Sequence, residues 1–193
     1  MMSAIDTALI KAGLTSDHAT CLKKTGHLKK LSKKELLITE GSTCNFFGIV
    51  ITGTLRSFVT NESEEYNTDF YLQEDFVTAL TSVLVQKPTS FNIEAVTDSD
   101  VFLLSVEQYQ QLVSQDPKWA LLGKFITETF FIRKCRREIS FLKHSAAQRL
   151  EMLLMTYPGI EQKVSQYHIA SYLGIRPESL SRIKLASATR EKG

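Results

Sequence analysis

Residues 166–184 read QYHIASYLGIRPESLSRIK and hold the pattern from which the fold of the chain can be inferred. A small residue, Ala170, precedes a glycine, Gly174, by four positions. Ala170 suits a point where two helices cross closely, and Gly174 can adopt the positive φ of a tight turn. A helix pair with a purely structural role is the alternative, but it would not require both residues. We therefore predict a helix-turn-helix, whose small core holds Ile169, Leu173, Ile175, Leu180 and Ile183.

The second helix of this pair should expose polar side chains that can contact bases. Arg176 and Pro177 open the helix, and Glu178 and Arg182 lie four residues apart, on one face. A carboxylate accepts a hydrogen bond from the amino group of cytosine, and a guanidinium binds O6 and N7 of guanine. We predict that these two side chains read a G·C step in double-stranded DNA. The other predicted DNA contacts are Gln166, Arg176, Ser179, Ser181 and Lys184.

Charge is distributed unevenly along the 193 residues, although the whole chain carries only +2. Residues 1–117 contain 9 Lys and Arg against 15 Asp and Glu, whereas residues 118–193 contain 14 against 6. A basic C-terminal part beside an acidic body is expected of a protein in which one part meets phosphates. A solvated charged surface is the alternative.

Between residues 36 and 105 the hydrophobic pattern changes to that of strands. Turn residues such as Gly41-Ser42, Gly53-Thr54 and the polar stretch 61–67 separate short apolar runs. Many short strands at close spacing predict a β-sandwich or jelly roll, which encloses an effector cavity or serves only as a dimer scaffold. The predicted strands are LLIT (36–39), FFGIVIT (46–52), LRSFVT (55–60), DFYL (69–72), FNIEAV (91–96) and VFLL (101–104).

A long helix should follow the strands. After a short helix at 106–115, Asp116 and Pro117 supply an N-cap and a proline at the first helical position, and the helix should continue to about His144. One apolar stripe, with Trp119, Leu122, Ile126 and Phe130, can pack on the roll. A second stripe, broken only by Glu128, has the spacing of a two-stranded coiled coil and predicts a homodimer rather than a helix buried in a monomer. The residues of this dimer stripe are Leu121, Phe125, Ile132, Cys135, Ile139 and Leu142.

Together these elements predict an α+β fold in three parts. Residues 1–115 would form the jelly roll, with a helical cap built by residues 3–35. Residues 116–144 would form the dimerisation helix. Residues 145–193 would form a small helix-turn-helix domain that begins with a helix at 146–156. The helical cap would include the lysine-rich segment with Lys23, Lys24, Lys29, Lys30, Lys33 and Lys34.

The cysteine, histidine and hydropathy patterns favour a cytoplasmic protein without a cofactor. Cys21, Cys44 and Cys135 are too far apart in sequence to suggest a metal site, and the four histidines are scattered. No apolar run approaches the roughly 18 residues that indicate a membrane span. The sequence contains no paired acid and base, nucleophile motif or phosphate loop, so we do not expect an enzyme.

The stretch IASYLGIRPESLSRIK (169–184) resembles the C-terminal DNA-binding motif of the Crp/Fnr family of bacterial transcription regulators. The resemblance extends to residues 116–144, which look like the dimerisation helix of that family. It also extends to residues 36–105, which resemble its cyclic-nucleotide-binding roll and carry matching glycines at Gly41, Gly48 and Gly53. The resemblance implies a homodimeric regulator that binds DNA and responds to a small-molecule effector. It also suggests RNA polymerase as a further partner.

The segment that would bind a cyclic nucleotide departs from the family pattern. In the family's receptors a short turn supplies a glycine backbone and a Glu carboxylate, and an Arg pairs with the cyclic phosphate. Aligning residues 75–98 with this segment places Thr78, Ala79 and Thr89 at these three positions. A threonine hydroxyl cannot replace a guanidinium beside a desolvated phosphate. The predicted effector pocket, with Thr78, Ala79, Thr89 and Ser90, should therefore not bind cyclic AMP, and it is either empty or adapted to another effector.

The DNA-binding motif also departs from the family pattern. The family often has Ser-Arg before the Glu, whereas Arg176-Pro177 stand here, and only nine residues follow Lys184, which leaves little room for a wing hairpin. A ligand-binding or protein-binding module that has lost its DNA role therefore stays open as the alternative function.

Overall fold

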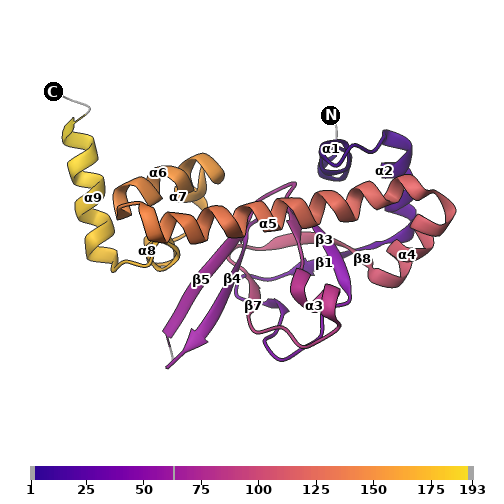
Figure 1. Ribbon diagram of the computed structural model, residues 1–193, viewed down its shortest axis with the longest axis horizontal. Helices are drawn as coiled ribbons and strands as arrows, with labels where there is room; N and C mark the ends of the chain where they lie inside the picture. Colours follow the sequence, from indigo (N-terminus) through magenta and orange to yellow (C-terminus); the bar gives the residue numbers. More distant parts are fainter. Residues whose placement is uncertain (1–2, 63, 191–193) are drawn as a thin grey trace.

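Two antiparallel four-stranded sheets form a β-roll in the computed structural model, which describes residues 3–62 and 64–190 (Figure 1). The strand order is β1-β8-β3-β6 in one sheet and β2-β7-β4-β5 in the other. Strands that are distant in sequence are neighbours, since β8 lies between β1 and β3. The predicted roll of antiparallel strands is confirmed. The strands are β1 His27–Leu31, β2 Leu36–Ile38, β3 Phe46–Thr52, β4 Leu55–Asn61, β5 Glu64–Tyr71, β6 Phe76–Val77, β7 Asn92–Ala95 and β8 Ser99–Ser105.

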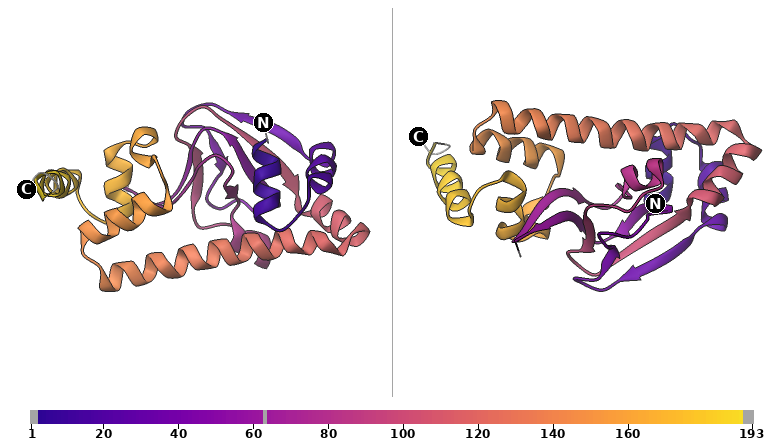
Figure 2. Two further views of the ribbon diagram at one scale, coloured as in Figure 1. Left: turned by 90° about the horizontal axis from the view of Figure 1, so that it is seen from above. Right: turned by 60° about the horizontal axis from the view of Figure 1, so that its bottom comes forward.

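The long helix α5, Ala120–Lys143, runs along the roll and reaches past it (Figures 1 and 2). In the described part of the chain, four α-helices and one 3-10 turn precede α5, and four α-helices follow it. The preceding elements are α1 Ala4–Lys11, α2 Ser16–Thr25, α3 Leu80–Val85 and α4 Val106–Gln115, with the 3-10 turn η1 Pro117–Trp119 joining α4 to α5. The helices beyond are α6 Ala146–Thr156, α7 Ile160–Lys163, α8 Gln166–Leu173 and α9 Pro177–Arg190.

The main hydrophobic core lies inside the roll and extends to α1, α2 and one face of α5. Trp119, Leu122, Ile126 and Phe130 are all buried in it, which confirms the apolar stripe predicted to pack on the roll. Phe125 also packs partly on this core, with its ring 5.9 Å from that of Phe76. Phe125 therefore belongs in part to the face that contacts the roll.

A second hydrophobic core joins the C-terminal helices to the roll. Ile169, Ala170, Leu173 and Leu180 are buried in it, as the sequence predicts, and Ile175 and Ile183 pack against it. Phe70 and Leu72, from β5 and the residue after it, are buried in the same cluster. The C-terminal helices therefore share their core with the outer face of the roll, which the sequence did not indicate.

Local signals fixed the ends of several helices. Asp116 caps the long helical region by accepting a hydrogen bond from the Lys118 amide at 3.0 Å, as predicted, but the first turn is η1 and α5 itself begins at Ala120. Ser145 and Gln148 form a reciprocal capping box at the start of α6, whose bounds match the predicted 146–156. Gly174 ends α8 in the left-handed region, with φ +67°.

Two predictions about the N-terminal half were wrong. The lysine-rich segment is not a single helical cap, because only Lys23 and Lys24 lie in α2, while Lys29 and Lys30 lie in β1, an edge strand. Lysines are common on edge strands, where their charge opposes pairing with other chains. The stretch 61–67 is not a long turn either, because β5 begins at Glu64 and pairs with β4.

Candidate functional site

A cavity of about 260 Å³ lies between the roll and α5. Its wall is mostly apolar, with hydroxyls and two charged groups among the rings and aliphatic chains. The lining residues are Ser57, Asp69, Tyr71, Thr78, Leu80, Thr81, Leu84, Phe91, Thr127, Phe130, Phe131 and Lys134. Leu84 and Phe131 are 63% and 68% exposed, so they mark its open side.

Only one of the four residues predicted for the effector pocket lines this cavity. Thr78 does so, and its hydroxyl donates to the Phe46 carbonyl at 2.7 Å. Ala79 is fully buried at the start of α3, and Ser90 is exposed. Thr89 is buried, and its backbone forms hydrogen bonds with residues 41 and 42, at 2.8 and 2.9 Å. The predicted segment, residues 75–98, does border the cavity. Apart from Thr78, however, its contacts with the cavity come from α3 and Phe91 and not from the residues that were predicted.

Two charged residues of the cavity wall, Asp69 and Lys134, were not predicted from the sequence. Asp69 is 5% exposed and accepts hydrogen bonds from the Phe70 amide at 2.9 Å and from the Tyr157 hydroxyl. Burial raises the pKa of Asp69, while the charge of Arg133 opposes this rise. Because Tyr157 is buried in the core of the C-terminal helices, Asp69 connects the cavity directly to those helices.

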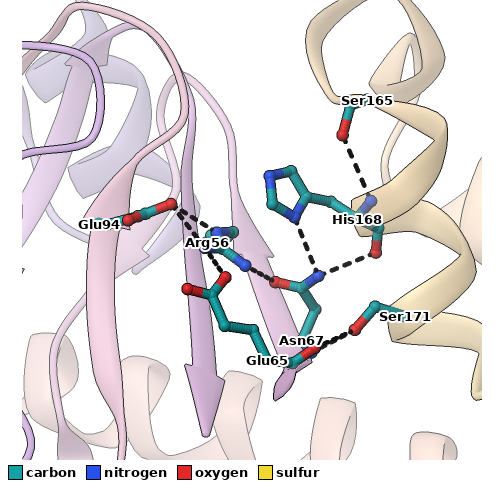
Figure 3. Close-up of polar contacts among 7 residues, drawn as sticks. All are labelled: Arg56, Glu65, Asn67, Glu94, Ser165, His168 and Ser171. Atoms are coloured by element: carbon teal, nitrogen blue, oxygen red, sulfur yellow. Dashed lines mark hydrogen bonds and ion pairs between the residues drawn. The ribbon is translucent and has the colours of Figure 1, made fainter. Parts of the chain in front are cut away.

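A polar junction joins β4 and β5 to α8 (Figure 3). The Asn67 side chain accepts from Arg56 at 2.8 Å and donates to the His168 carbonyl at 3.0 Å. The Ser171 hydroxyl donates to the Glu65 carbonyl at 2.9 Å, and the Asn67 amide donates to Ser171 at 2.9 Å. Three of these four bonds pair groups about 100 residues apart in sequence, which no local pattern predicts.

The centre of this junction is a buried arginine. Arg56 is 2% exposed and forms ion pairs with Glu65 and with Glu94, the latter at 2.7 Å (Figure 3). Its guanidinium also lies 4.1 Å from the centre of the Phe58 ring. Two carboxylates and an amide thus compensate the buried charge, as a guanidinium away from water requires. Partial burial, together with the charge of Arg56, lowers the pKa of the neighbouring His168 to about 4.

Arginines of α5 reinforce the same contact. Arg137 donates to the carbonyls of Asn67 at 3.1 Å and Tyr172 at 3.2 Å. Arg133 pairs with Asp75, which follows β5, at 2.7 Å. Arg137 therefore helps to hold α8 against β5, while Arg133 joins α5 to the residues that follow β5.

The residues predicted to contact DNA lie on and beside α9, the outermost helix (Figure 1). Arg176, Glu178, Ser181 and Arg182 are exposed, and Ser179 is half-buried. Arg182 donates to the Ser179 hydroxyl at 3.3 Å. The first turn of α9 borders a groove of about 660 Å³, whose other wall is the end of the β4–β5 hairpin with Glu64, Glu65 and Tyr66.

The two remaining residues predicted to contact DNA, Lys184 and Gln166, are hydrogen-bonded to each other. The Lys184 amine donates to the Gln166 side chain at 2.5 Å and forms an ion pair with Glu161. These bonds hold the starts of α7 and α8 against α9.

The dimer stripe of α5 faces away from the roll over most of its length. Leu121, Ile132, Ile139 and Leu142 are 40–82% exposed, whereas Phe125 and Cys135 are half-buried. Phe131, which was not assigned to the stripe, extends this exposed apolar surface.

The roll matches a known family of domains. Residues 28–116 match the cyclic nucleotide-binding domain. Among curated proteins, none matches the chain.

Solved structures of several regulators share the fold over most of the chain. FixK2 from Bradyrhizobium japonicum has a TM-score of 0.75 at 19% identity, with 86% of each chain covered. A mutant of CooA from Carboxydothermus hydrogenoformans has a TM-score of 0.71 at 18% identity, covering 89% of this chain and 79% of CooA. A protein from Eubacterium rectale, described as a transcriptional regulator of the Crp/Fnr family, has a TM-score of 0.67 at 18% identity, covering 92% and 85%. The molecule therefore has the fold of Crp/Fnr-type regulators.

Within residues 3–62 and 64–190, no helix is long and apolar enough to cross a membrane. The same residues contain no group of three or more His, Cys, Asp and Glu side chains placed to hold a metal ion.

Proposed function

We propose that this chain is a homodimeric, DNA-binding transcription regulator of the Crp/Fnr type, whose roll responds to an effector other than cyclic AMP. The observation that carries this proposal is the geometry of the α8–α9 pair. Ala170 is fully buried where the helices meet, Gly174 makes the turn, and Glu178 and Arg182 remain exposed on α9. An exposed acid and guanidinium on the second helix of such a pair suit a helix-turn-helix that reads DNA.

The outer face of α5 supports the homodimer. Large apolar side chains at the spacing of a coiled coil are exposed along this helix, and a two-fold pairing of α5 helices would bury them. Such a dimer presents two α9 helices, so the operator should be an inverted repeat with half-sites about one helical turn apart. Contact with RNA polymerase would follow if the protein activates transcription.

The composition of the cavity argues against a cyclic nucleotide. Its walls contain no arginine, and their one cation, Lys134, lacks the planar fork with which a guanidinium binds two phosphate oxygens. A phosphate in a partly dry cavity needs charged, bidentate partners, which Thr78 and the distant Thr89 cannot supply. Calorimetry with cyclic AMP should therefore show no saturable binding.

DNA binding tests the main proposal. The purified protein should bind duplexes selected from a random pool, and the affinity should fall steeply as salt is raised, because phosphate contacts release counterions. Failure to bind any duplex at low salt would favour the alternative of a ligand-binding or protein-binding module without a DNA role. Repeating the selection with small-molecule extract would show whether an effector is required.

A further inference from the structure

We propose that the cavity between the roll and α5 binds a small apolar molecule with a single carboxylate, and that Lys134 pairs with this carboxylate. This inference deepens the effector role proposed above by naming the class of ligand. Binding itself does not depend on DNA and can be measured without it.

The size and the walls of the cavity select a small apolar ligand. A volume of about 260 Å³ lies just below the usual range of roughly 300–1,000 Å³ for ligand pockets. Tyr71, Phe91, Phe130 and Phe131 surround it with four aromatic rings, and Leu80 and Leu84 add aliphatic contacts. A single ring or a short alkyl chain would be buried well here.

Lys134 is the cation of the cavity wall that has no ion-paired or hydrogen-bonded partner. Its side chain lines the cavity and forms neither kind of bond within the described part of the chain, although the charge of Asp69 acts on it. The side chain is accessible at the cavity mouth, yet the surrounding protein atoms lower the pKa of its amine. A bound carboxylate would favour the protonated amine and form a charge-assisted hydrogen bond.

The neighbouring charges are already compensated, which distinguishes them from Lys134. Asp75 pairs with Arg133 at 2.7 Å. Burial raises the pKa of Asp69, which favours its neutral form, and Asp69 already accepts two hydrogen bonds. Because Asp69 already accepts two hydrogen bonds and the Lys134 amine donates none to the described residues, a ligand carboxylate finds a more available partner here than a ligand amine does.

Hydroxyl groups of the cavity wall can donate hydrogen bonds to the second oxygen of the ligand carboxylate. Ser57 and Thr78 are engaged with Thr68 and Phe46, at 2.8 and 2.7 Å. Thr81 and Thr127 are exposed at the cavity, and their hydroxyls have no partner in the described residues, so they can donate to a ligand.

Occupancy of the cavity would reach the C-terminal helices through Asp69. This residue lines the cavity and holds the Tyr157 hydroxyl, which is buried with Phe70 in the second core. A ligand carboxylate beside Lys134 changes the charge that Asp69 experiences. We therefore expect the ligand to change DNA affinity as well as to bind.

The test is calorimetry on the full chain with benzoate, phenylacetate and hexanoate, each paired with its neutral amide. At least one carboxylate should bind with a dissociation constant in the micromolar range, and its amide should bind at least about tenfold more weakly, since the pairing with Lys134 is lost. Lys134→Met should cause a similar loss. Lys124→Met, on the exposed side of the same helix with an ion pair to Glu128, should leave the affinity unchanged.

Several outcomes would overturn the inference. Equal binding of acid and amide, or full affinity in a folded Lys134→Met variant, would remove the role of Lys134. If none of the three carboxylates binds, the ligand class is wrong. If Lys134→Met does not fold by circular dichroism, the comparison of acid with amide on the unmodified protein decides. Because these titrations contain no DNA, their result is independent of whether the chain binds an operator.

Discussion

At the scale of single residues, Glu178 and Arg182 should carry sequence discrimination. Both are exposed on α9, whereas Leu180 between them is fully buried. Arg182→Ala should cost about 1–3 kcal/mol on the best operator and relax the preference at one base pair, because a bidentate contact to guanine is lost. Binding measured across operator variants checks this. An equal loss on every sequence would make Arg182 a phosphate contact only.

Lys184 is the matched cation for that experiment. Lys184→Ala should weaken binding to all sequences alike and reduce the salt slope by about one unit, as the loss of a phosphate contact does. In the free protein Lys184 is paired with Glu161 and Gln166. If the salt slope does not change, these intramolecular bonds persist on DNA and Lys184 has only a structural role.

His168 should make stability depend on pH. Its pKa is lowered to about 4 by partial burial and by Arg56, from 6.5 in the absence of such effects. Between these values the unfolded chain binds a proton that the folded chain does not, so the free energy of unfolding should fall as the pH is lowered from about 6.5 towards 4. Asp69, whose pKa is raised, contributes with the opposite sign.

The contribution of His168 can be isolated by comparison with His168→Gln, which stays neutral across this range. The free energy of unfolding of the unsubstituted protein minus that of His168→Gln should fall as the pH is lowered from 6.5 to 4. Urea unfolding at several pH values measures it. A difference that stays constant would mean that His168 ionises as readily in the folded chain as in the unfolded one.

At the scale of elements, the β4–β5 hairpin should stabilise the placement of α8. Asn67 is fully buried and bridges Arg56 to the His168 carbonyl. Asn67→Ala should lower the free energy of unfolding by about 1–3 kcal/mol, because polar groups are left buried without partners. Asn61→Ala, at the exposed end of β4, should change it by less than about 0.5 kcal/mol. Similar effects of the two substitutions would show that the junction does not contribute to stability.

The elements that the sequence predicted correctly are those with local signals. The capping box of Ser145 and Gln148 marks α6, and Gly174 marks the end of α8. The strand β1, with the sequence HLKKL, was missed because its edge position leaves it without the alternation of a half-buried strand. Glu64 to Asn67 were assigned to a turn because they are polar, although Asn67 is buried by contacts with α8.

At the scale of the whole molecule, the cavity and the second hydrophobic core, which were not predicted, both join distant parts of the chain. The cavity combines β4, β5 and α3 with α5, and its charged residues Asp69 and Lys134 are 65 residues apart in the sequence. The second core likewise combines Phe70 with helices that follow about 80 residues later. Periodicity and caps report on one element at a time, so neither the lining of the cavity nor the junction with the C-terminal helices was visible in the sequence.

Assembly into a dimer should depend on the exposed apolar side chains of α5. Ile132 and Leu142 are 47% and 82% exposed on the dimer stripe, so Ile132→Glu with Leu142→Glu should give a monomer with an intact roll. These positions are preferable to Phe125, whose contact with Phe76 means that its substitution would also disturb the roll. Charges placed on the dimer stripe would have to be buried without partners in the dimer, which is strongly unfavourable.

Light scattering and circular dichroism measure the two expected results, a halved mass and an unchanged fold. Ile10→Glu is the control, because Ile10 is a similarly exposed apolar residue, at 48%, on α1 and outside the dimer stripe. The control should remain a dimer.

The monomeric variant should also lose most of its operator affinity, because each half-site is then bound independently and the two contacts no longer reinforce each other. A dimer that survives both glutamates would place the interface on another surface, and a monomer in the unmodified protein at micromolar concentration would exclude the proposed assembly.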